Sequence, residues 1–466
     1  MKRINMKWIN MKRIISIVIP IIVLTGCSTV PKSELEVSQP AEHSIVKDND
    51  SSYLLFDDWL ATVPNNEKEW LDLQPEDYLT DFEMFYQEFM KNFPYIGVAK
   101  RKYGIDYERN YHNTRTLLKS CTNDFDYYHL LREHFFEYIY VGHLDIWGTR
   151  YNSYIEEWKD YASESDGMAF RYKILNNPVS KKNYARMEKV IDALSSKYDD
   201  YVLQFDVRKE EEPDISPDLG RDNPNVSLEI IEEDNIAKVT INSFDMSLFE
   251  EDKKILFEYY HKIQNYKHII FDIRQNTGGG MEYFNELVMA PFINEKVSVP
   301  VYIFMKNGEI TKDTLSAHMG NDIDWKPMSE VPALVGLNKD DRLELDYFYQ
   351  FSYEIEPTSE NINFSGKMWM LVGSNNYSSA EYAAMMAKES NFATLVGENT
   401  GGDGIGIDPT FIVMPKSGFV VQYSPIYGTD ANGVNSEEAG TSPHIYSTDE
   451  LDAFEACMNS IHDMED

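Results

Sequence analysis

The sequence predicts an α/β protein with a mostly parallel sheet and covering helices, preceded by a small N-terminal helical domain. From residue 226 onward, apolar strand-like runs alternate with amphipathic segments, a pattern typical of parallel sheets covered by helices. Residues 78–140 instead carry apolar residues at helical spacing, for instance Phe82, Phe85 and Phe89. The chain has 466 residues, 42% of them hydrophobic, which is enough to build a large core in roughly two or three domains.

The first 26 residues have the composition of an export signal. Five positively charged residues precede the apolar run IISIVIPIIVLTG, which ends at Cys27. A spanning helix needs about 20 apolar residues, so this run predicts export rather than integration into the membrane. The segment LTGC resembles the lipobox of bacterial lipoproteins, which implies a lipidated Cys27 and a protein anchored to the extracytoplasmic side of the cell membrane. An ordinary signal peptide or an uncleaved anchor is the alternative.

The composition of the chain after residue 26 indicates a tether and excludes several kinds of partner and site. Residues 27–52 are polar and poor in aromatic residues, which predicts a flexible tether. Loss of residues 1–26 moves the formal net charge from −35 to −40, and such a chain repels phosphate backbones, so we expect no nucleic-acid partner. Beyond Cys27 only Cys121 and Cys457 remain, too few for a disulfide framework. No cluster of His, Cys and acidic residues has metal-ligand spacing, so we expect no metal or cofactor.

The chain divides into three predicted segments after the tether. Residues 53–150 form the N-terminal helical domain, 151–225 a helical insertion and linker, and 226–466 the α/β domain. A PDZ domain needs a glycine-containing loop that binds a carboxylate, and residues 151–205 contain a single glycine, Gly167. No PDZ domain is therefore predicted.

Within the α/β domain, the order of elements locates the candidate site. We expect strands at 235–244, 267–274, 367–373 and 392–397, and helices at 248–265, 281–293 and 379–390. Because sites in parallel sheets lie at the carboxyl ends of strands, the loops that follow strands 267–274 and 367–373 are the candidates.

The first of these loops is glycine-rich. In DIRQNTGGG, residues 272–280, three consecutive glycines let the backbone approach a ligand closely, and the N-terminus of the next helix favours negative charge. A phosphate-binding loop would continue with Lys and Ser or Thr, but Met281 and Glu282 occupy those positions. An oxyanion hole therefore fits better than a nucleotide site. A turn that needs glycine only for steric reasons is the alternative.

The second loop, NNYSSAEYAAM at residues 375–385, places two hydroxyl groups before a helix. Ser378 is followed three residues later by Glu381, which is the spacing of a capping box. For an isolated motif of this kind, capping of the helix is the commoner explanation. A nucleophilic serine is the other, and the local sequence leaves both open.

Several motifs together resemble one family. FDIRQNTGGG is similar to the Asp-x-Arg-x-Asn-x-Gly-Gly element, and SSAE to the Ser-Ala-x-Glu element, of the C-terminal-processing and tricorn-core serine peptidases, relatives of the tail-specific proteases. The segments YVGHLDIW, LVGENTGG, MPKSGFVVQYSP and NGVNSEEAGTSPHI also look like elements of that family. The resemblance spans about residues 78–446. It implies a ClpP/crotonase-like fold and a serine-type peptidase that hydrolyses peptide or protein substrates through an acyl-enzyme.

The resemblance also implies the catalytic residues. The family nucleophile falls on Ser378. The lysine of the processing branch falls on Asp403, so a Ser–Lys dyad is not expected, and the tricorn-like branch supplies a histidine instead. His143 in YVGHLDIW matches that histidine, and a neutral imidazole is suited to accept the proton of a serine near neutral pH.

Two further positions complete the implied site. Glu437 matches the glutamate that stabilises the imidazole directly or through a linking group, with Glu438 as a rival one position away. In tricorn a hydroxyl residue precedes the histidine, whereas this chain has Gly142.

The oxyanion hole is expected from the N–H of Gly278 or Gly279 together with the N–H of Ser379. A catalytically inactive binder of peptides or small apolar ligands on the same fold is the alternative function, since the family also resembles retinoid-binding proteins without protease activity. The sequence indicates no oligomeric state.

Overall fold

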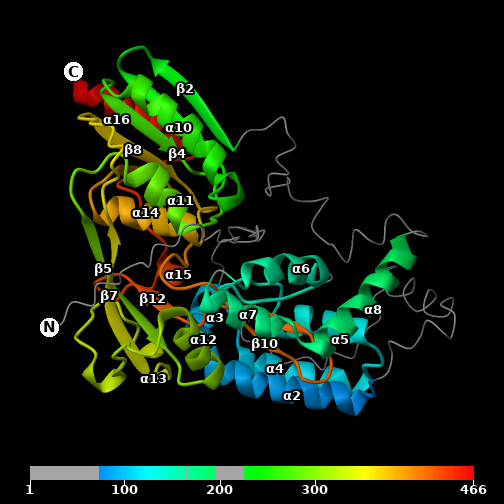
Figure 1. The fold of residues 1–466 in the computed structure, drawn as a ribbon. Coiled ribbons are helices and arrows are strands. Elements are labelled where there is room, and N and C mark those ends of the chain that lie inside the picture. The colour runs from blue at the N-terminus through cyan, green and yellow to red at the C-terminus, as the bar shows by residue number, and fades with distance from the viewer. Residues whose placement is uncertain (1–72, 149, 164, 196–224, 466) are drawn as a thin grey trace.

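The computed structural model describes residues 73–148, 150–163, 165–195 and 225–465. The predicted export signal, Cys27 and the predicted tether lie outside these residues. The described chain forms an α/β lobe and a helical lobe, with a second sheet beside them (Figure 1). The predicted fold class, a mostly parallel sheet with helices and an N-terminal helical region, is confirmed.

The central sheet of the α/β lobe has six strands in the order β13-β9-β8-β4-β3-β2. All neighbouring strands are parallel except β2 and β3. The strands are β2 (Val226–Glu232), β3 (Ile236–Ile241), β4 (His268–Asp272), β8 (Lys367–Val372), β9 (Thr394–Gly397) and β13 (Ile445–Tyr446). Every residue of β4 is buried, as expected for a strand that helices cover on both faces.

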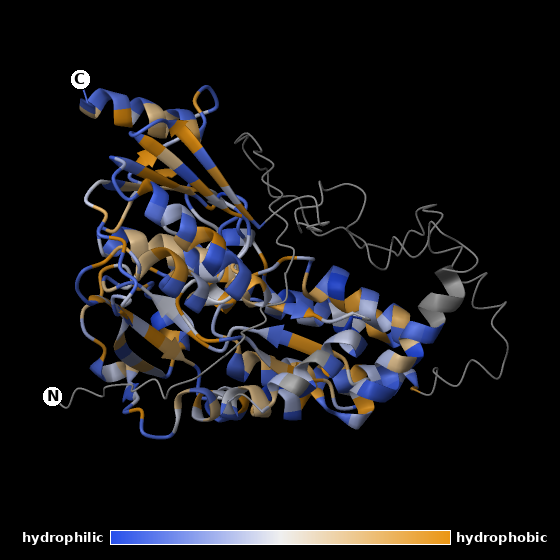
Figure 2. Cartoon of the chain, turned by 45° about the horizontal axis from the view of Figure 1, so that its top comes forward, coloured by the Kyte–Doolittle hydropathy of each residue, from blue (hydrophilic) through white to orange (hydrophobic). Residues whose placement is uncertain are grey.

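Helices cover the two faces of this sheet. On one face, α10 (Phe249–Ile263), α11 (Met281–Tyr283) with its π-helical continuation η5 (Phe284–Met289), and α14 (Ser379–Glu389) share an apolar core with the strands. On the other face, α16 (Ala453–Glu465) packs on residues such as Trp369 and Leu371. In Figure 2 the strands of this sheet are mostly orange, while the outer faces of the helices are largely blue. The pattern is that of a sheet buried between helical layers.

A second, antiparallel sheet was not predicted. Its order is β12-β5-β7-β6, and its strands are β5 (Val297–Met305), β6 (Lys326–Pro327), β7 (Tyr347–Ile355) and β12 (Tyr427–Thr429). The connection from β5 to β7 contains α12 (Glu309–Met319), η6 (Met328–Glu330) and α13 (Asp341–Glu344), and α15 (Ser436–Ala439) follows β12. Most residues of β7 are only half-buried, so the strand lacks the continuous apolar run that identified β4 and β8.

The helical lobe contains helices of the predicted N-terminal domain and of the predicted helical insertion that follows it. They are α2 (Pro75–Asn92), α3 (Ile96–Tyr103), α4 (Tyr107–Leu117), η2 (Leu118–Ser120), α5 (Asp124–Leu130), the π-helical turn η3 (Leu131–Phe135), α6 (Tyr151–Tyr161), α7 (Asp166–Leu175) and α8 (Pro178–Ser195). The phenylalanines at helical spacing lie in its core. Phe82, Phe85 and Phe89 all pack against the edge of the Phe135 ring, with ring centroids 5.3 to 5.6 Å apart.

A late segment of the chain returns to the helical lobe. The small sheet β1-β11-β10 joins β1 (Asp145–Ile146) to β10 (Thr410–Val413) and β11 (Val420–Tyr423). Phe411 and Phe419 belong to the same apolar core as the N-terminal helices, and β10 lies among those helices in Figure 1. The predicted boundary at residue 226 therefore does not separate the two lobes in space.

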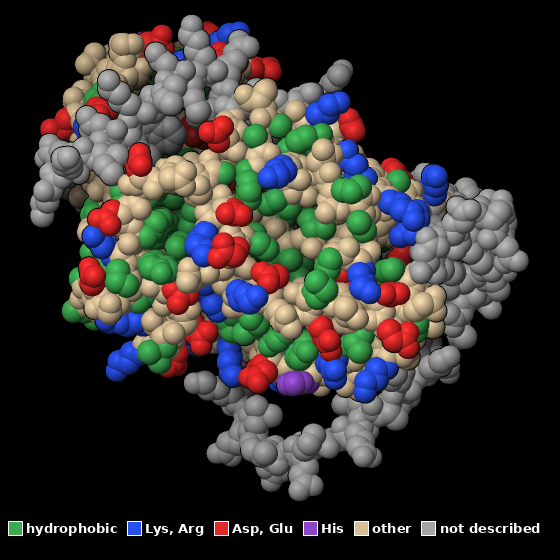
Figure 3. Space-filling model, turned by 60° about the horizontal axis from the view of Figure 1, so that its bottom comes forward, with side chains coloured by type: hydrophobic (Ala, Val, Ile, Leu, Met, Phe, Trp, Pro, Cys, Tyr) green, Lys and Arg blue, Asp and Glu red, His purple; other side chains and the backbone are tan. Residues whose placement is uncertain are grey.

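The distribution of surface charge, the two described cysteines and the apolarity of the helices can be compared with the sequence analysis. On the face in Figure 3, acidic and basic side chains are interspersed. Cys121 and Cys457 are buried and unpaired, and they lie in different cores. Within the described ranges, no helix is long and apolar enough to span a bilayer.

Candidate active site

Ser378 lies in a strained turn between β8 and α14. Its backbone has φ 56° and ψ −124°, and it occupies the N-cap position of α14, yet its side chain makes no capping hydrogen bond. The Glu381 carboxylate does not reach back either; it accepts hydrogen bonds from Thr400 and Thr441. The capping-box alternative is therefore wrong. A strained turn of this kind holds a serine oxygen clear of the strand and helix, as nucleophilic serines require.

Backbone contacts hold this turn in place. The Ser378 N–H donates to the Gly402 carbonyl at 3.0 Å. The buried Asn376 side chain donates to the carbonyls of Ile273 and Asn276 and accepts from the Gly373 N–H at 2.8 Å. These bonds tie the serine turn to the glycine loop, and they help offset a backbone strain of about 1–3 kcal/mol.

The glycine loop runs against Ser378. A Cβ on Gly278 would lie 3.2 Å from the Ser378 Cβ, and a Cβ on Gly279 only 2.1 Å from the Phe244 carbonyl oxygen. Both glycines also have positive φ, 121° and 139°. The loop therefore packs closely on Ser378 and Phe244, and it needs glycine at both positions.

The backbone N–H groups of Gly278, Gly279 and Ser379 are the predicted oxyanion donors, and they differ in whether they already donate a hydrogen bond. The Gly278 N–H donates to the Asn276 Oδ1 at 2.9 Å. In the described chain, the N–H groups of Gly279 and Ser379 donate to no acceptor. The Ser379 hydroxyl donates to the Gly279 carbonyl at 2.6 Å and so fixes the two groups relative to each other. Of the predicted oxyanion donors, Gly279 and Ser379 are thus free, whereas Gly278 is engaged within its own loop.

His143 comes from the helical lobe, in the loop that precedes β1. Its ring Nδ1 lies 2.6 Å from the Asp403 Oδ2 and 3.1 Å from the Ser424 Oγ, and the residue is 5% exposed. Since a carboxylate only accepts hydrogen bonds, Nδ1 must be the protonated nitrogen of the neutral ring. The ring Nε2 is then left as the proton acceptor.

Asp403 is held by three donors. Besides His143, the Ser424 hydroxyl donates to its Oδ2 at 2.7 Å and the Tyr95 hydroxyl to its Oδ1 at 2.8 Å. The sequence analysis treated Asp403 only as the residue that replaces a lysine. It reaches the site because the Gly402 carbonyl binds the Ser378 N–H, so the segment before Asp403 runs beside the serine turn. An acid at that position of a glycine-rich loop was the available signal.

Tyr95 also explains why glycine precedes the histidine. A Cβ on Gly142 would lie 2.4 Å from the Tyr95 ring, and Gly142 has φ 54°. A hydroxyl residue there would be both strained and in collision with this ring. The hydroxyl beside the imidazole comes instead from Ser424, whose N–H donates to the Gly142 carbonyl at 2.7 Å.

The two glutamates occupy different positions. Glu437 is fully buried, and its Oε2 accepts from the Tyr377 hydroxyl at 2.7 Å. That hydroxyl in turn lies 3.4 Å from the His143 backbone N–H. Among the described hydrogen bonds, Tyr377 links Glu437 to His143, and none joins Glu437 to the imidazole. Glu438 forms an ion pair with Arg101 of α3 at 2.6 Å.

Burial raises the pKa of Glu437 from its ordinary value of 4.5 to about 8, and Asp403 adds to the rise while Lys102 opposes it. The Lys102 Nζ lies 3.6 Å from the Glu437 Oε1, which has no hydrogen-bond partner in the described chain. Since the ion pair is long, we regard desolvation as the stronger influence.

This shift predicts a pH-dependent stability. The folded protein binds a proton at Glu437 that the unfolded chain releases above pH 4.5, so the stabilisation is lost as pH rises toward 8. Between pH 6.5 and 8 this group should lower the free energy of unfolding by about 2 kcal/mol, and Glu437→Gln should remove that decrease. Chemical denaturation across this range measures it. Glu381→Gln is the control, because the pKa of Glu381 is raised only to about 6.

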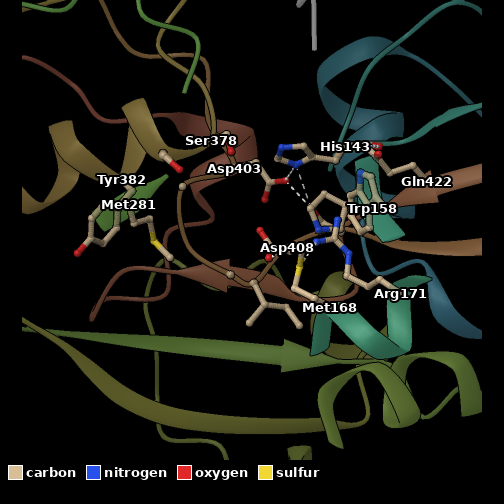
Figure 4. Close-up of a pocket in the computed structure, with 16 residues that line it drawn as sticks. His143, Trp158, Met168, Arg171, Met281, Ser378, Tyr382, Asp403, Asp408 and Gln422 are labelled. Atoms are coloured by element: carbon tan, nitrogen blue, oxygen red, sulfur yellow. Dashed lines mark hydrogen bonds and ion pairs between the residues drawn. The ribbon is translucent and has the colours of Figure 1, made fainter. Parts of the chain in front are cut away.

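One pocket brings these residues together. Ser378, Ser379, His143, Asp403 and Ser424 all line it, and its empty space amounts to about 780 Å³ including the part open to solvent. In Figure 4 Ser378 and His143 lie at one end of the pocket, with Asp403 beside the imidazole. No hydrogen bond joins the Ser378 hydroxyl to the ring in the described structure.

The described lining of the pocket offers no base for a Ser–Lys dyad. The lining contains no lysine. In the part of the chain that the structure describes, no group of three or more His, Cys, Asp and Glu residues could hold a metal ion.

Comparisons with known proteins bear on the fold and the family. Residues 235–447 match Peptidase family S41, while no curated protein matches the chain. Among solved structures, a "putative peptidase" from Parabacteroides merdae superposes with a TM-score of 0.50 at 17% identity, covering 84% of this chain and 97% of that chain. This likeness shows the fold.

Two more distant structures are a lipoprotein from Streptococcus agalactiae (TM-score 0.39, 11% identity, 84% of this chain and 98% of that chain) and the photosystem II D1 C-terminal processing protease (TM-score 0.32, 14% identity, 50% and 52%). Over residues 235–447 the chain matches the model of Peptidase family S41, a family of serine-type peptidases.

Proposed function

We propose that this protein is a serine endopeptidase in which Ser378 is the nucleophile, His143 the general base and Asp403 the group that orients the imidazole. The observation that carries the proposal is that Ser378 and His143, from different lobes, line one pocket while Asp403 binds the Nδ1 of the ring. This replaces Glu437 by Asp403 as the carboxylate partner of the base.

The reaction follows from these positions. The His143 Nε2 accepts the proton of the Ser378 hydroxyl as the serine oxygen attacks the peptide carbonyl carbon. The oxyanion of the tetrahedral intermediate receives hydrogen bonds from the N–H groups of Gly279 and Ser379. His143 then gives its proton to the leaving amine, and the C–N bond breaks to leave an acyl-enzyme that water hydrolyses. Asp403 stabilises the imidazolium that forms in both halves of the reaction.

Cellular context is a further part of the proposal. We infer from the basic and apolar N-terminal segment that the protein is exported, and from LTGC that Cys27 is lipidated and anchors it to the membrane. The active-site pocket would then face peptides on the extracytoplasmic side.

A fluorophosphonate probe tests the nucleophile. The probe should form a covalent adduct on Ser378, located by mass spectrometry of the digested protein, and Ser378→Ala should abolish labelling. Ser390→Ala is the control: its hydroxyl donates to the Met386 carbonyl at the end of α14, and Ser390 does not line the pocket, so labelling should persist.

Absence of an adduct on a folded protein would contradict the proposal. It would favour the inactive binder, for which the missing hydrogen bond between Ser378 and His143 is the supporting observation.

A further inference from the structure

Arg171 of α7 is a buried cation in the wall of the pocket. It is 6% exposed, and its guanidinium lies 4.1 Å from the centre of the Trp158 ring and 5.5 Å from that of Phe411. Burial lowers the pKa of Arg171 to about 10, so the group remains charged at neutral pH. A cation is rarely buried in apolar surroundings unless charged and hydrogen-bonding partners satisfy it.

The partners of Arg171 are incomplete. A guanidinium carries five N–H donors. Its Nη1 lies 3.3 Å from the Asp408 Oδ2 and 3.7 Å from the Met168 sulfur. Its Nε is buried without a hydrogen-bond partner, and no described residue bonds Nη2. Asp408, itself 27% exposed, is therefore the only anion that the described residues place at this guanidinium.

Arg101 is an arginine of this chain whose guanidinium has more hydrogen-bond partners. Arg101 binds Asp341 through Nη1 and Nη2, at 2.9 and 2.6 Å, and also Glu438 through Nε and Nη2, at 2.8 and 2.6 Å. One guanidinium thus holds two carboxylates at once, as its planar fork of donors allows. Arg171 has the same donors and only one carboxylate.

The surroundings favour an anion that comes from outside the chain. Arg171 is the one Lys or Arg residue among the described residues that line the pocket. His318 lies 4.0 Å from Asp408, but burial lowers its pKa, so it does not compete as a cation. The carboxylate oxygens of Asp403 already accept hydrogen bonds from three donors. In Figure 4 Arg171 and Asp408 lie across the pocket from Ser378.

We propose that Arg171 binds a carboxylate of the substrate and so selects peptides that carry one near the bond to be cleaved. The carboxylate comes from an acidic side chain or from the C-terminus of the peptide. The inference deepens the proposed peptidase function and relies on it for the peptide nature of the ligand.

Binding to the Ser378→Ala protein tests this without hydrolysis. Fluorescence anisotropy would compare labelled peptides in which a single Glu or Gln is moved along an alanine-rich sequence, and matched peptides with a free or an amidated C-terminus. At least one acidic member should bind roughly tenfold more tightly than its neutral counterpart, as a charge-assisted hydrogen bond predicts. The pair that responds identifies the source of the carboxylate.

Two second-site variants separate recognition from packing. Arg171→Met keeps an apolar side chain against Trp158 and should abolish the preference. Asp408→Asn leaves the guanidinium in place and removes the competing carboxylate, so the preference should increase. A role in packing alone would not give these opposite responses.

Equal affinity within every pair, binding of no peptide, or tighter binding of peptides with lysine would overturn the proposal. Failure of the peptidase assignment is seen separately, because it appears as the absence of a fluorophosphonate adduct on Ser378 in the protein with Arg171 intact.

Discussion

Replacement of His143 by alanine should lower kcat for peptide hydrolysis by about 10⁴- to 10⁶-fold, as removal of a catalytic base does in serine peptidases. The described lining of the pocket contains no lysine, and Asp403 binds the Nδ1 of the imidazole. No other side chain in the pocket is therefore placed to accept the proton of Ser378 near neutral pH. Initial rates with an internally quenched peptide measure the loss.

A control variant and a rescue experiment would attribute the loss of activity to the His143 imidazole. His444→Ala is the control, since the His444 ring accepts a hydrogen bond from the Leu395 N–H and lies outside the pocket; it should leave kcat nearly unchanged. Added imidazole should restore part of the activity of His143→Ala, because the deletion leaves room beside Asp403. Retention of full activity by His143→Ala would show that another group is the base.

Asp403→Asn should lower kcat by about 10⁴-fold with little effect on KM. An asparagine amide can donate to Nδ1, which then favours the ring tautomer with its proton on Nε2, where it cannot accept from serine. The asparagine also fails to stabilise the imidazolium. Kinetics of the same peptide, with circular dichroism to verify folding, measure this effect.

Glu437→Gln distinguishes the two carboxylates. The Tyr377 hydroxyl links Glu437 to His143, and a glutamine oxygen can still accept that hydrogen bond. We expect less than about tenfold loss of kcat. A large loss in Glu437→Gln together with a small loss in Asp403→Asn would restore Glu437 as the acidic partner that the sequence motif implied.

Much of the fold was predictable from local pattern. β4 and β8 are continuous apolar runs because helices cover both faces of the sheet, and burial is what makes such strands visible in a sequence. Phe82, Phe85 and Phe89 repeat at helical spacing for the same reason. The antiparallel sheet escaped prediction because β7 is largely half-buried and pairs with β5 across some forty residues, a contact that no local period records.

The carboxylate partner of the imidazole could not be predicted from the sequence, because tertiary contacts determine it. Motifs indicated Ser378 and His143, but the partner of the imidazole is set by a strand pair that returns to the helical lobe. That return places Ser424, after β11, beside the ring, and Asp403 lies just before β10. Tyr95 of the helical lobe completes the set. The apolar pattern of β10 and β11 indicates strands but not which lobe they join.

The most direct test is a crystal structure of the protein after reaction with a fluorophosphonate. We predict phosphorus bonded to the Ser378 Oγ, a phosphoryl oxygen that accepts hydrogen bonds from the N–H groups of Gly279 and Ser379, and the His143 Nε2 within hydrogen-bonding distance of the adduct. An adduct on a different residue, or His143 turned away from Ser378 with another base in its place, would contradict the mechanism.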